Sequence, residues 1–440
     1  MKQILLLISL FIFPYSYAQT PEPCGHKAYI DYLNELQPGF KSHYNQIYHR
    51  TVEESQLKNK FEKKDTLHTI KVVFHVVYNN VVENLHDSLI YSQMDVLNEC
   101  FRRQNADTIS TRDIFLDVAG DAGIEFELAD TDPDGNPTTG IVRQLTTARS
   151  FLTSGINIQE ADAVKFEVLG SPAWNTEKYL NIWICDLSVQ GQDLLLGYAF
   201  PPTNAAFWGS NSFVPANRQG VVLHYKVVGE GNRFSLSTGA KTAVHEVGHY
   251  LGLRHTWGDA PNFNRCAPNY DDFIWDTPLS GTSSSASGCN LNKNTCNRTE
   301  PGDLPDQIEN YMDYAPGQCQ NMFTNGQIDV MRNNLTTFRS EVYRSEYPPA
   351  PPVLEPGTPI GVYPNPVKDK LAISLSSVDT TNTYSIRIVS LLGQEMVTIP
   401  LEQKESQLIE YQFGFKGLFL YQIVNQDGVA IKEERLTFIN

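Results

Sequence analysis

The chain has 440 residues, which is too long for one ordinary hydrophobic core, so two or more domains are expected. Charged residues make up 19% of the chain and apolar residues 41%, a balance that excludes a disordered polymer. The formal net charge of −16 argues against nucleic acid as a partner, and seven cysteines fit an oxidising compartment.

The first 18 residues have the pattern of a secretory signal peptide. Lys2 supplies a positive start, an apolar run extends from Ile4 to Phe13, and Ser16 and Ala18 precede the expected cut. The run is too short to span a bilayer, and no later stretch is long and apolar enough to do so. We therefore expect export of a chain without a transmembrane segment.

Residues 19–60 are polar and mixed, with a helical-looking stretch at Ala28–Leu33 and a basic, cleavable-looking Lys58-Asn59-Lys60. Cys24 lies near the start of this segment. A thiolate is a good zinc ligand, so a cysteine on a removable segment could displace the catalytic water of a zinc enzyme and keep it latent. The alternative is an ordinary free or disulfide-bonded cysteine. The odd cysteine count favours the inhibitory role, because at least one thiol lies outside the intramolecular disulfides.

From Thr69 onwards the composition predicts regular structure. Ile70–Tyr78 is β-branched and aromatic, which predicts a central strand in which His75 is a packed residue and not a ligand. Apolar residues then recur at helical spacing from Leu89 to Phe101, with Asp87 as the expected N-cap. Further strands are predicted at Ile124–Leu128, Tyr179–Cys185 and Val221–Tyr225. The last of these is the candidate edge strand that would pair with an extended peptide substrate.

The stretch His-Glu-Val-Gly-His-Tyr-Leu-Gly-Leu-Arg-His begins at His245. On a helix, His245 and His249 project from one face, where two imidazoles can hold one Zn²⁺ at ~2.0–2.1 Å. Gly252 can adopt a left-handed conformation, so the helix can end there and the turn can bring His255 back as a third ligand. Three histidines with one open position are typical of a catalytic zinc, and Glu246 can act on the water as a general base. The short His-Glu-x-x-His motif also occurs by accident on amphipathic helices, but the added glycine and histidine form the metzincin pattern.

Beyond His255 the sequence predicts loops, and Ser280–Gly288 is almost entirely small and polar. Four cysteines fall in this irregular half, and spacing alone does not reveal their pairing: Cys266, Cys289, Cys296 and Cys319. Oxygen donors also cluster here and could hold Ca²⁺, with a solvated acidic loop as the equal alternative: Asp271, Asp272, Asp276 and Thr277.

Six prolines between residues 346 and 360 favour an extended linker and mark a domain boundary. The remaining residues alternate between polar and apolar in short runs separated by turns, which predicts a small all-β sandwich. Its strands are expected at Leu371–Ser374, Tyr384–Val389, Leu418–Val424 and Glu433–Phe438.

The motif from His245 to His255, followed by Thr-Trp-Gly-Asp and by Asn-Tyr-Met-Asp-Tyr at residues 310–314, resembles the pappalysin branch of the metzincins. The resemblance covers roughly residues 70–340. It implies a secreted zinc endopeptidase made as a zymogen, in which Cys24 binds the zinc of the latent form. It also implies that Met312 lies in the turn beneath the metal, and that Tyr314 moves on and off the metal and stabilises the transition state.

The same resemblance implies the disulfides Cys266–Cys296 and Cys289–Cys319. It also implies calcium ligation near Asp272 and Thr277. It gives no role to Cys100 and Cys185, which could pair with each other or remain buried thiols. Related bacterial enzymes that cut beside Arg or Lys carry acidic residues just after the turn tyrosine. Here Ala315–Cys319 has no carboxylate, so a strict basic preference is not implied.

The C-terminal part resembles the type A sorting domain of the type IX secretion system. The resemblance is carried by Val362–Val367, Ser390–Gln394 and the closing strand Gly417–Tyr421. It implies that the secretion machinery is a partner and that the chain crosses the periplasm and the outer membrane to become secreted or attached to the cell surface.

The combined prediction is an α+β protein. Its metzincin-type catalytic domain has a mixed sheet, a backing helix, an active-site helix and a loop-rich C-terminal half, and a small all-β sandwich follows. The expected order is a signal peptide (1–18), an inhibitory propeptide (19–60), a zinc metallopeptidase domain (61–345), a linker (346–360) and a sorting domain (361–440). We expect a monomeric endopeptidase with a catalytic zinc and a structural calcium, acting on proteins and peptides. The alternative is a surface adhesion or binding protein with a vestigial metal site.

Overall fold

The structure is a computed structural model. It describes residues 23–58, 67–202, 216–232, 240–259, 266–267, 269–285, 288–296, 303–339, 342, 360–363, 370–375, 383–390, 394–401, 406–410 and 417–438. The predicted signal peptide, Asn59 and Lys60 of the basic stretch and the prolines of the linker lie outside these residues. The chain divides into two compact units, Met1–Ser345 and Glu346–Asn440. No helix within the described residues has the length and apolar character needed to cross a membrane.

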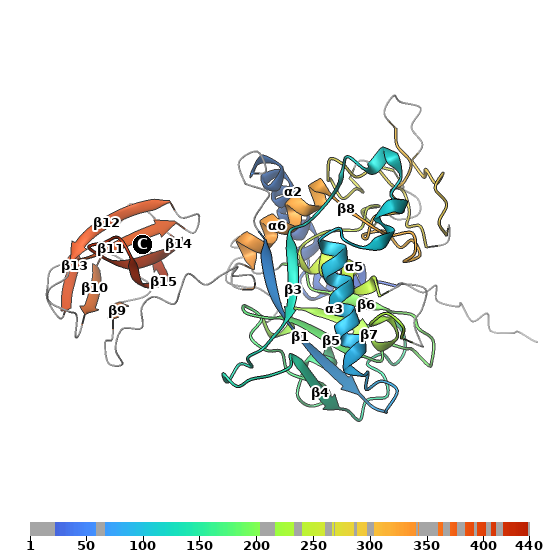
Figure 1. The fold of residues 1–440 in the computed structure, drawn as a ribbon, viewed down its shortest axis with the longest axis horizontal. Coiled ribbons are helices and arrows are strands. Elements are labelled where there is room, and N and C mark those ends of the chain that lie inside the picture. Colours follow the sequence, from blue (N-terminus) through green and yellow to red (C-terminus); the bar gives the residue numbers. More distant parts are fainter. Residues whose placement is uncertain are drawn as a thin grey trace, which may run out of the picture. The chain divides into compact units, whose positions relative to one another are not determined.

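Two helices precede the catalytic sheet. Helix α1 (His26–Leu36) buries one apolar stripe, including Tyr29 and Leu33, because these residues recur at helical spacing. Helix α2 (Phe40–Lys58) contacts α1 and lies against α6 (Asn325–Phe338) (Figure 1). The described part of the segment that was predicted to be removable therefore consists mainly of two helices that pack on the rest of the unit.

The central sheet has the strand order β3-β1-β5-β7-β6, with β4 (Ile141–Leu145) also pairing with β1. Four pairings are parallel, whereas β6 runs antiparallel to β7. The bounds of the strands on the main path are β1 His68–Tyr78, β3 Ile124–Leu128, β5 Leu180–Cys185, β6 Gly197–Ala199 and β7 Val221–His224. The mixed sheet that the sequence predicts is confirmed.

Both faces of the sheet are covered, because alternate side chains of β1 and β5 enter two separate apolar clusters. Phe74 and Val76 face the cluster formed with helices α3 (Asp87–Phe101) and α5 (Thr242–Tyr250), which are the predicted backing and active-site helices. Trp183 faces the second cluster, to which α1 contributes. His75 is a packed strand residue as predicted, with its two ring nitrogens bonded to Ser171 Oγ and Asn181 Oδ1.

Two sequence predictions in this region are wrong. The strand at Val221–His224 is internal, and the edge of the sheet is β6, whose three residues are too few to give a recognisable strand pattern. The N-cap of α3 is His86, one residue before Asp87, because the His86 Nδ1 accepts from the backbone N–H of Ser88. One error concerns the edge of the sheet and the other the cap of a helix. Both depend on a single neighbouring group and not on a repeating pattern.

The remaining regular elements of this unit are helix α6 and several short strands, helices and turns. Helix α6 begins with a capping box in which the side chains of Thr324 and Gln327 bond reciprocally to backbone N–H groups. The other elements are β2 (Ala119–Gly120), which pairs with β8 (Phe323–Thr324), helix α4 (Ile158–Ala161), and the 3₁₀ turns Ala106–Ser110, Asp113–Phe115, Asp162–Lys165, Ala216–Arg218 and Tyr225–Val227. The described part of 256–322 has little regular structure, as predicted.

The C-terminal unit is all-β, as predicted, and its two sheets share one apolar core. Ile373 of the first sheet packs with Ile386, Tyr421 and Leu436 of the second. The sheets have the orders β13-β10-β9 and β12-β11-β14-β15. Their strands are β9 Ile360–Tyr363, β10 Lys370–Leu375, β11 Tyr384–Ser390, β12 Glu395–Leu401, β13 Ser406–Glu410, β14 Gly417–Asn425 and β15 Ala430–Phe438. The four predicted strands are present, and β9, β12 and β13 were not predicted.

Candidate active site

Helix α5 presents the histidine motif inside the protein. Every residue from Ala243 to Tyr250 is buried, so neither face of this helix meets solvent. The helix ends at Tyr250, and Gly252 then adopts a φ of +95°, a conformation that costs a side-chain-bearing residue ~1–2 kcal/mol. A Cβ on Gly252 would also lie 2.1 Å from the Nδ2 of Asn334. Backbone conformation and space therefore both require glycine where the chain turns back.

The turn brings three imidazoles to one point. The Nε2 of His249 lies 3.1 Å from the Nε2 of His245 and 3.1 Å from the Nε2 of His255. Ligands held tetrahedrally at the usual Zn–N distance are about 3.3 Å apart, so the three nitrogens are spaced as zinc ligands would be. The Cys24 thiol completes a group whose ligand atoms all lie within 4.8 Å of one another. No other group of three or more His, Cys, Asp or Glu ligands occurs in the described part of the chain.

The opposite nitrogen of each ring is held by an acceptor. His245 Nδ1 donates to the carbonyl oxygen of Tyr311 (2.7 Å), His249 Nδ1 to that of Leu253 (2.8 Å), and His255 Nδ1 to Asp259 Oδ1 (2.6 Å). These bonds select the tautomer whose Nε2 lone pair points to the shared centre. Burial lowers the pKa of His245 to about 3, which keeps the ring neutral. The donor set fits a divalent metal ion.

Glu246 lies beside this centre and is completely buried. Its Oε2 is 3.6 Å from the Cys24 Sγ, and its Oε1 has no hydrogen-bond partner among the described residues. Burial raises the pKa of Glu246 to about 8. A buried carboxylate oxygen without a partner is costly to stability, so its retention at a metal centre indicates a chemical role.

The N-terminal segment enters the site along the edge strand. Pro23 O accepts from the backbone N–H groups of Leu196 and Gly197, and Gly25 N donates to Gly197 O at 2.9 Å. These bonds pair the segment in parallel with β6 and place the Cys24 thiol at the three histidines. A Cβ on Gly197 would lie 2.9 Å from Glu246 Cγ, so the edge-strand backbone passes directly over the glutamate.

The following residues extend this contact. The His26 ring stacks on His249 with a centroid distance of 4.1 Å. Arg254, which immediately precedes the third histidine, lies over the ring of Tyr48 at 3.9 Å and donates to Asn45 Oδ1. No sequence pattern indicates a role for His26, Arg254, Asp259 or Gly197. A repeating pattern could not have identified them, because each acts through a tertiary contact.

The predicted turn lies beneath the centre. Met312 is completely buried, and a Cβ on Gly248 would lie 2.5 Å from its Sδ, so this glycine of α5 makes room for the thioether. The Tyr314 ring lies 4.8 Å from that of His255, and its hydroxyl is 3.5 Å from the carbonyl oxygen of Cys24. Tyr314 therefore points at a peptide carbonyl that lies next to the metal ligands.

The two predicted calcium ligands lie together in the loop-rich half. Asp272 is buried, its Oδ1 accepts from Thr277 Oγ1 at 2.6 Å, and its Oδ2 has no hydrogen-bond partner among the described residues. Burial, reinforced by Asp271, raises the pKa of Asp272 well above its ordinary value. A bound cation would offset the negative charge of this buried carboxylate, so Asp272 and Thr277 could form part of a Ca²⁺ ligand set.

Two disulfides fasten the loop-rich half. The structure joins Cys266 to Cys296 and Cys289 to Cys319, with Cα–Cα distances of 5.5 and 5.7 Å. Cys100 and Cys185, for which the sequence left pairing open, are separate buried thiols.

Comparison with known proteins gives consistent relatives. A family model described as pregnancy-associated plasma protein-A, of peptidase family M43, matches residues 165–336, and a secretion system C-terminal sorting domain matches residues 361–434. An extracellular metalloprotease of Verticillium alfalfae is 32% identical over 275 residues, covering 62% of this chain and 77% of the relative. Extracellular metalloprotease 1 of Coccidioides posadasii is 39% identical over 145 residues, covering 33% of this chain and 46% of the relative.

Two solved structures are also similar. Mature mirolysin of Tannerella forsythia in complex with a cleaved peptide is 42% identical, with a TM-score of 0.53 and coverage of 64% of this chain and 96% of that chain. A promirolysin mutant from the same organism is 37% identical, with a TM-score of 0.59 and coverage of 73% and 97%.

Proposed function

This chain belongs to the pappalysin family of metallopeptidases, peptidase family M43, and we propose that it is a secreted zinc endopeptidase made as a latent precursor. Membership of this family identifies the chain as a metalloprotease. The observation that carries the finer proposal is the convergence of three imidazole Nε2 atoms beside a buried glutamate. The rival proposal, an adhesion protein with a vestigial metal site, would not need that glutamate.

The proposed chemistry assigns His245, His249 and His255 as zinc ligands. When bound, Zn²⁺ acts as a Lewis acid and lowers the pKa of its water towards ~7. Glu246 takes the proton from the attacking water and passes it to the leaving amine, a task suited to a carboxylate whose pKa burial has raised. Tyr314 donates its hydroxyl hydrogen to the carbonyl oxygen of the cleaved bond, where negative charge develops.

The substrate would bind along β6. In the structure the backbone groups of Leu196 and Gly197 bond to Pro23 and Gly25, so the same groups can pair with an extended peptide once that segment leaves. This geometry supports endoproteolysis, because an edge strand can pair with the middle of an extended chain. Mirolysin, at 42% identity, was solved with a cleaved peptide, which supports the assignment.

Latency would come from the segment that now fills the site. Cys24 would bind the zinc and displace water, while Pro23 and Gly25 cover the peptide-binding edge. Activation then requires a cut after the second helix and release of the segment that precedes the cut, and the expected cut lies outside the described residues. The similarity to promirolysin supports a precursor of this kind.

Export is indicated by the C-terminal sorting domain and by relatives that are extracellular proteases. We further propose that the type IX secretion machinery recognises this domain and that the enzyme acts as a monomer on protein and peptide substrates.

Cleavage of a randomised peptide library tests the proposed function. We expect the secreted enzyme to cut internal peptide bonds, to lose activity with a zinc chelator and to regain it with added Zn²⁺. The same library reports the residues preferred beside the cut, which we do not expect to be strictly Arg or Lys because Ala315–Cys319 carries no carboxylate. Absence of cleavage, or full activity in the presence of chelator, would contradict the proposal.

We also propose that Asp272 and Thr277 help to bind a structural Ca²⁺. Removing calcium with a selective chelator is expected to lower the Tm of the wild-type protein by about 5 °C, because a ligand that binds only the folded state stabilises it. Asp272→Asn should lack this calcium-dependent shift, whereas the exposed-loop variant Asp134→Asn should retain it. Identical melting of the wild-type protein with and without calcium would refute the site.

A further inference from the structure

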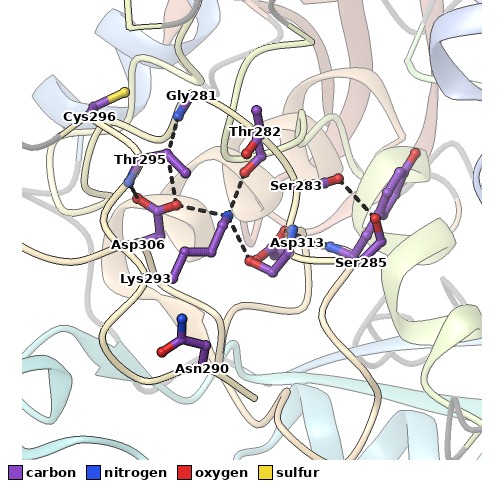
Figure 2. Close-up of polar contacts among 12 residues, drawn as sticks. Gly281, Thr282, Ser283, Ser285, Asn290, Lys293, Thr295, Cys296, Asp306 and Asp313 are labelled. Atoms are coloured by element: carbon purple, nitrogen blue, oxygen red, sulfur yellow. Dashed lines mark hydrogen bonds and ion pairs between the residues drawn. The ribbon is translucent and has the colours of Figure 1, made fainter. Parts of the chain in front are cut away.

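Lys293 lies in a buried polar network beside the turn that carries Tyr314 (Figure 2). Its Nζ forms an ion pair with Asp306 Oδ2 at 2.8 Å and donates to the carbonyl oxygen of Thr282 at 2.7 Å and to Ser284 Oγ at 2.9 Å. The three ammonium donors therefore all have acceptors. Only 9% of the Lys293 side chain and 1% of the Asp306 side chain are exposed, so this is an internal ion pair.

The network reaches the active-site turn through Ser284 and Asp313. Ser284 donates its backbone N–H to Asp313 Oδ1 at 2.8 Å and its hydroxyl to Asp313 Oδ2. Asp313 Oδ1 also accepts from the backbone N–H of Tyr314 at 2.7 Å. A single carboxylate thus joins the loop at residues 281–285 to the backbone of Tyr314.

The other end of the network is fixed to a cross-linked loop. Asp306 accepts from the N–H and the hydroxyl of Thr295 at 3.0 and 2.8 Å, and Thr295 precedes Cys296, which forms the disulfide with Cys266. The carbonyl oxygen of Lys293 accepts from the N–H of Asp306 at 2.8 Å. Lys293 therefore sits at the junction of three chain segments, none of which carries a metal ligand.

A stability role alone explains this network poorly. Burying a lysine and two carboxylates requires removal of their hydration, and an apolar core of the same volume is often equally stable. The charged groups instead fix an orientation, because a carboxylate with several fixed donors can hold a backbone N–H group in one direction. The group so held is Tyr314, whose ring contacts His255 and Trp257 at centroid distances of 4.8 and 4.7 Å.

We propose that Lys293 and Ser284 are positioning residues for Tyr314, acting through the Asp313 carboxylate. The proposal rests on the proposed catalytic role of Tyr314. Loss of the Ser284 hydroxyl would free one carboxylate oxygen and disconnect it from Lys293, so the tyrosine hydroxyl would point at the reacting carbonyl for less of the time. Substrate binding along β6 would not change, so kcat should fall while KM stays constant.

A double-mutant cycle on the secreted, zinc-loaded enzyme tests the proposal. We expect Ser284→Ala to lower kcat by about 10- to 100-fold with KM unchanged, and to change kcat less than about 2-fold in a chain that already carries Tyr314→Phe. Lys293→Met should show the same dependence on Tyr314. The control is Ser171→Ala. It removes a buried hydroxyl that is hydrogen-bonded to His75 of strand β1, and it should leave kcat unchanged.

Each contrary result has a distinct meaning. If Tyr314→Phe lowers kcat but Ser284→Ala does not, or if both losses multiply in the double variant, the positioning role is refuted and the proposed function stands. If Tyr314→Phe has normal kcat, the catalytic role of the tyrosine is refuted and the positioning role with it. Zinc content and Tm of each variant show that the losses arise in folded, metal-loaded enzyme.

Discussion

Glu246→Gln is expected to lower kcat by about 10²- to 10⁴-fold, the contribution typical of a general base. The substitution removes the carboxylate that accepts the proton. It preserves the volume of a side chain that is completely buried beneath the β6 backbone. The three imidazoles keep their acceptors at Tyr311, Leu253 and Asp259, so metal binding should persist. Steady-state kinetics on a peptide substrate, with metal content measured in the same preparation, checks this result.

The matched control for this variant is Glu83→Gln. Glu83 is also a buried glutamate whose pKa burial raises, but it accepts from the backbone N–H of Asn79 outside the metal centre. We expect it to retain normal kcat. Near-normal turnover by Glu246→Gln would show that another group accepts the proton and would remove Glu246 from the proposed mechanism.

Cys24→Ala is expected to give a full-length chain that cleaves peptides without processing, whereas the unprocessed wild-type chain should be inactive. Each ~1.4 kcal/mol lost from the inhibitory contact shifts the ratio of open to closed sites tenfold, so the loss of a metal–thiolate bond should raise activity by at least about 10-fold. The gain should be smaller than that from removing the whole segment, because Pro23 and Gly25 still pair with β6 and His26 still stacks on His249.

Cys185→Ala is the control for this second experiment. Cys185 is a buried free thiol like Cys24, but it lies at the end of β5 and belongs to no group of ligands. We expect this variant to remain latent before processing and to reach normal activity afterwards. An unprocessed Cys24→Ala chain that stayed inactive would show that the helices α1 and α2 suffice for inhibition and that the thiol is dispensable.

The features that could be predicted from the sequence are those set by local repeats. The spacing of His245, His249 and Gly252 specifies one helix face and the turn that ends it. The buried strand β1 is recognisable because seven of the nine residues from Ile70 to Tyr78 are apolar, the exceptions being Lys71 and His75. The small all-β unit was also recognisable, because its turns separate alternating runs.

Features that depend on a distant partner could not be predicted in this way. The three-residue β6 is an edge strand only because β7 pairs with it, and the packed position of His26 depends on His249, which is more than two hundred residues away in the chain. Lys293 looks like an ordinary loop lysine in the sequence, and only the fold shows that Asp306 and Ser284 enclose its ammonium. The role of Tyr314 came from resemblance to a family, whereas that of Cys24 was first inferred from thiolate chemistry and the odd cysteine count.

Metal analysis of the purified Glu246→Gln chain freed of residues 19–60 tests the central claim most directly, because this variant should not digest itself and the Cys24 thiol is no longer present as a further zinc ligand. We predict a stoichiometry of one zinc per chain by inductively coupled plasma mass spectrometry, reduced to near zero when His255→Ala is added, since the remaining imidazoles form an incomplete site. A folded Glu246→Gln chain without bound transition metal, or one whose zinc is unaffected by His255→Ala, would contradict a centre built from these three histidines.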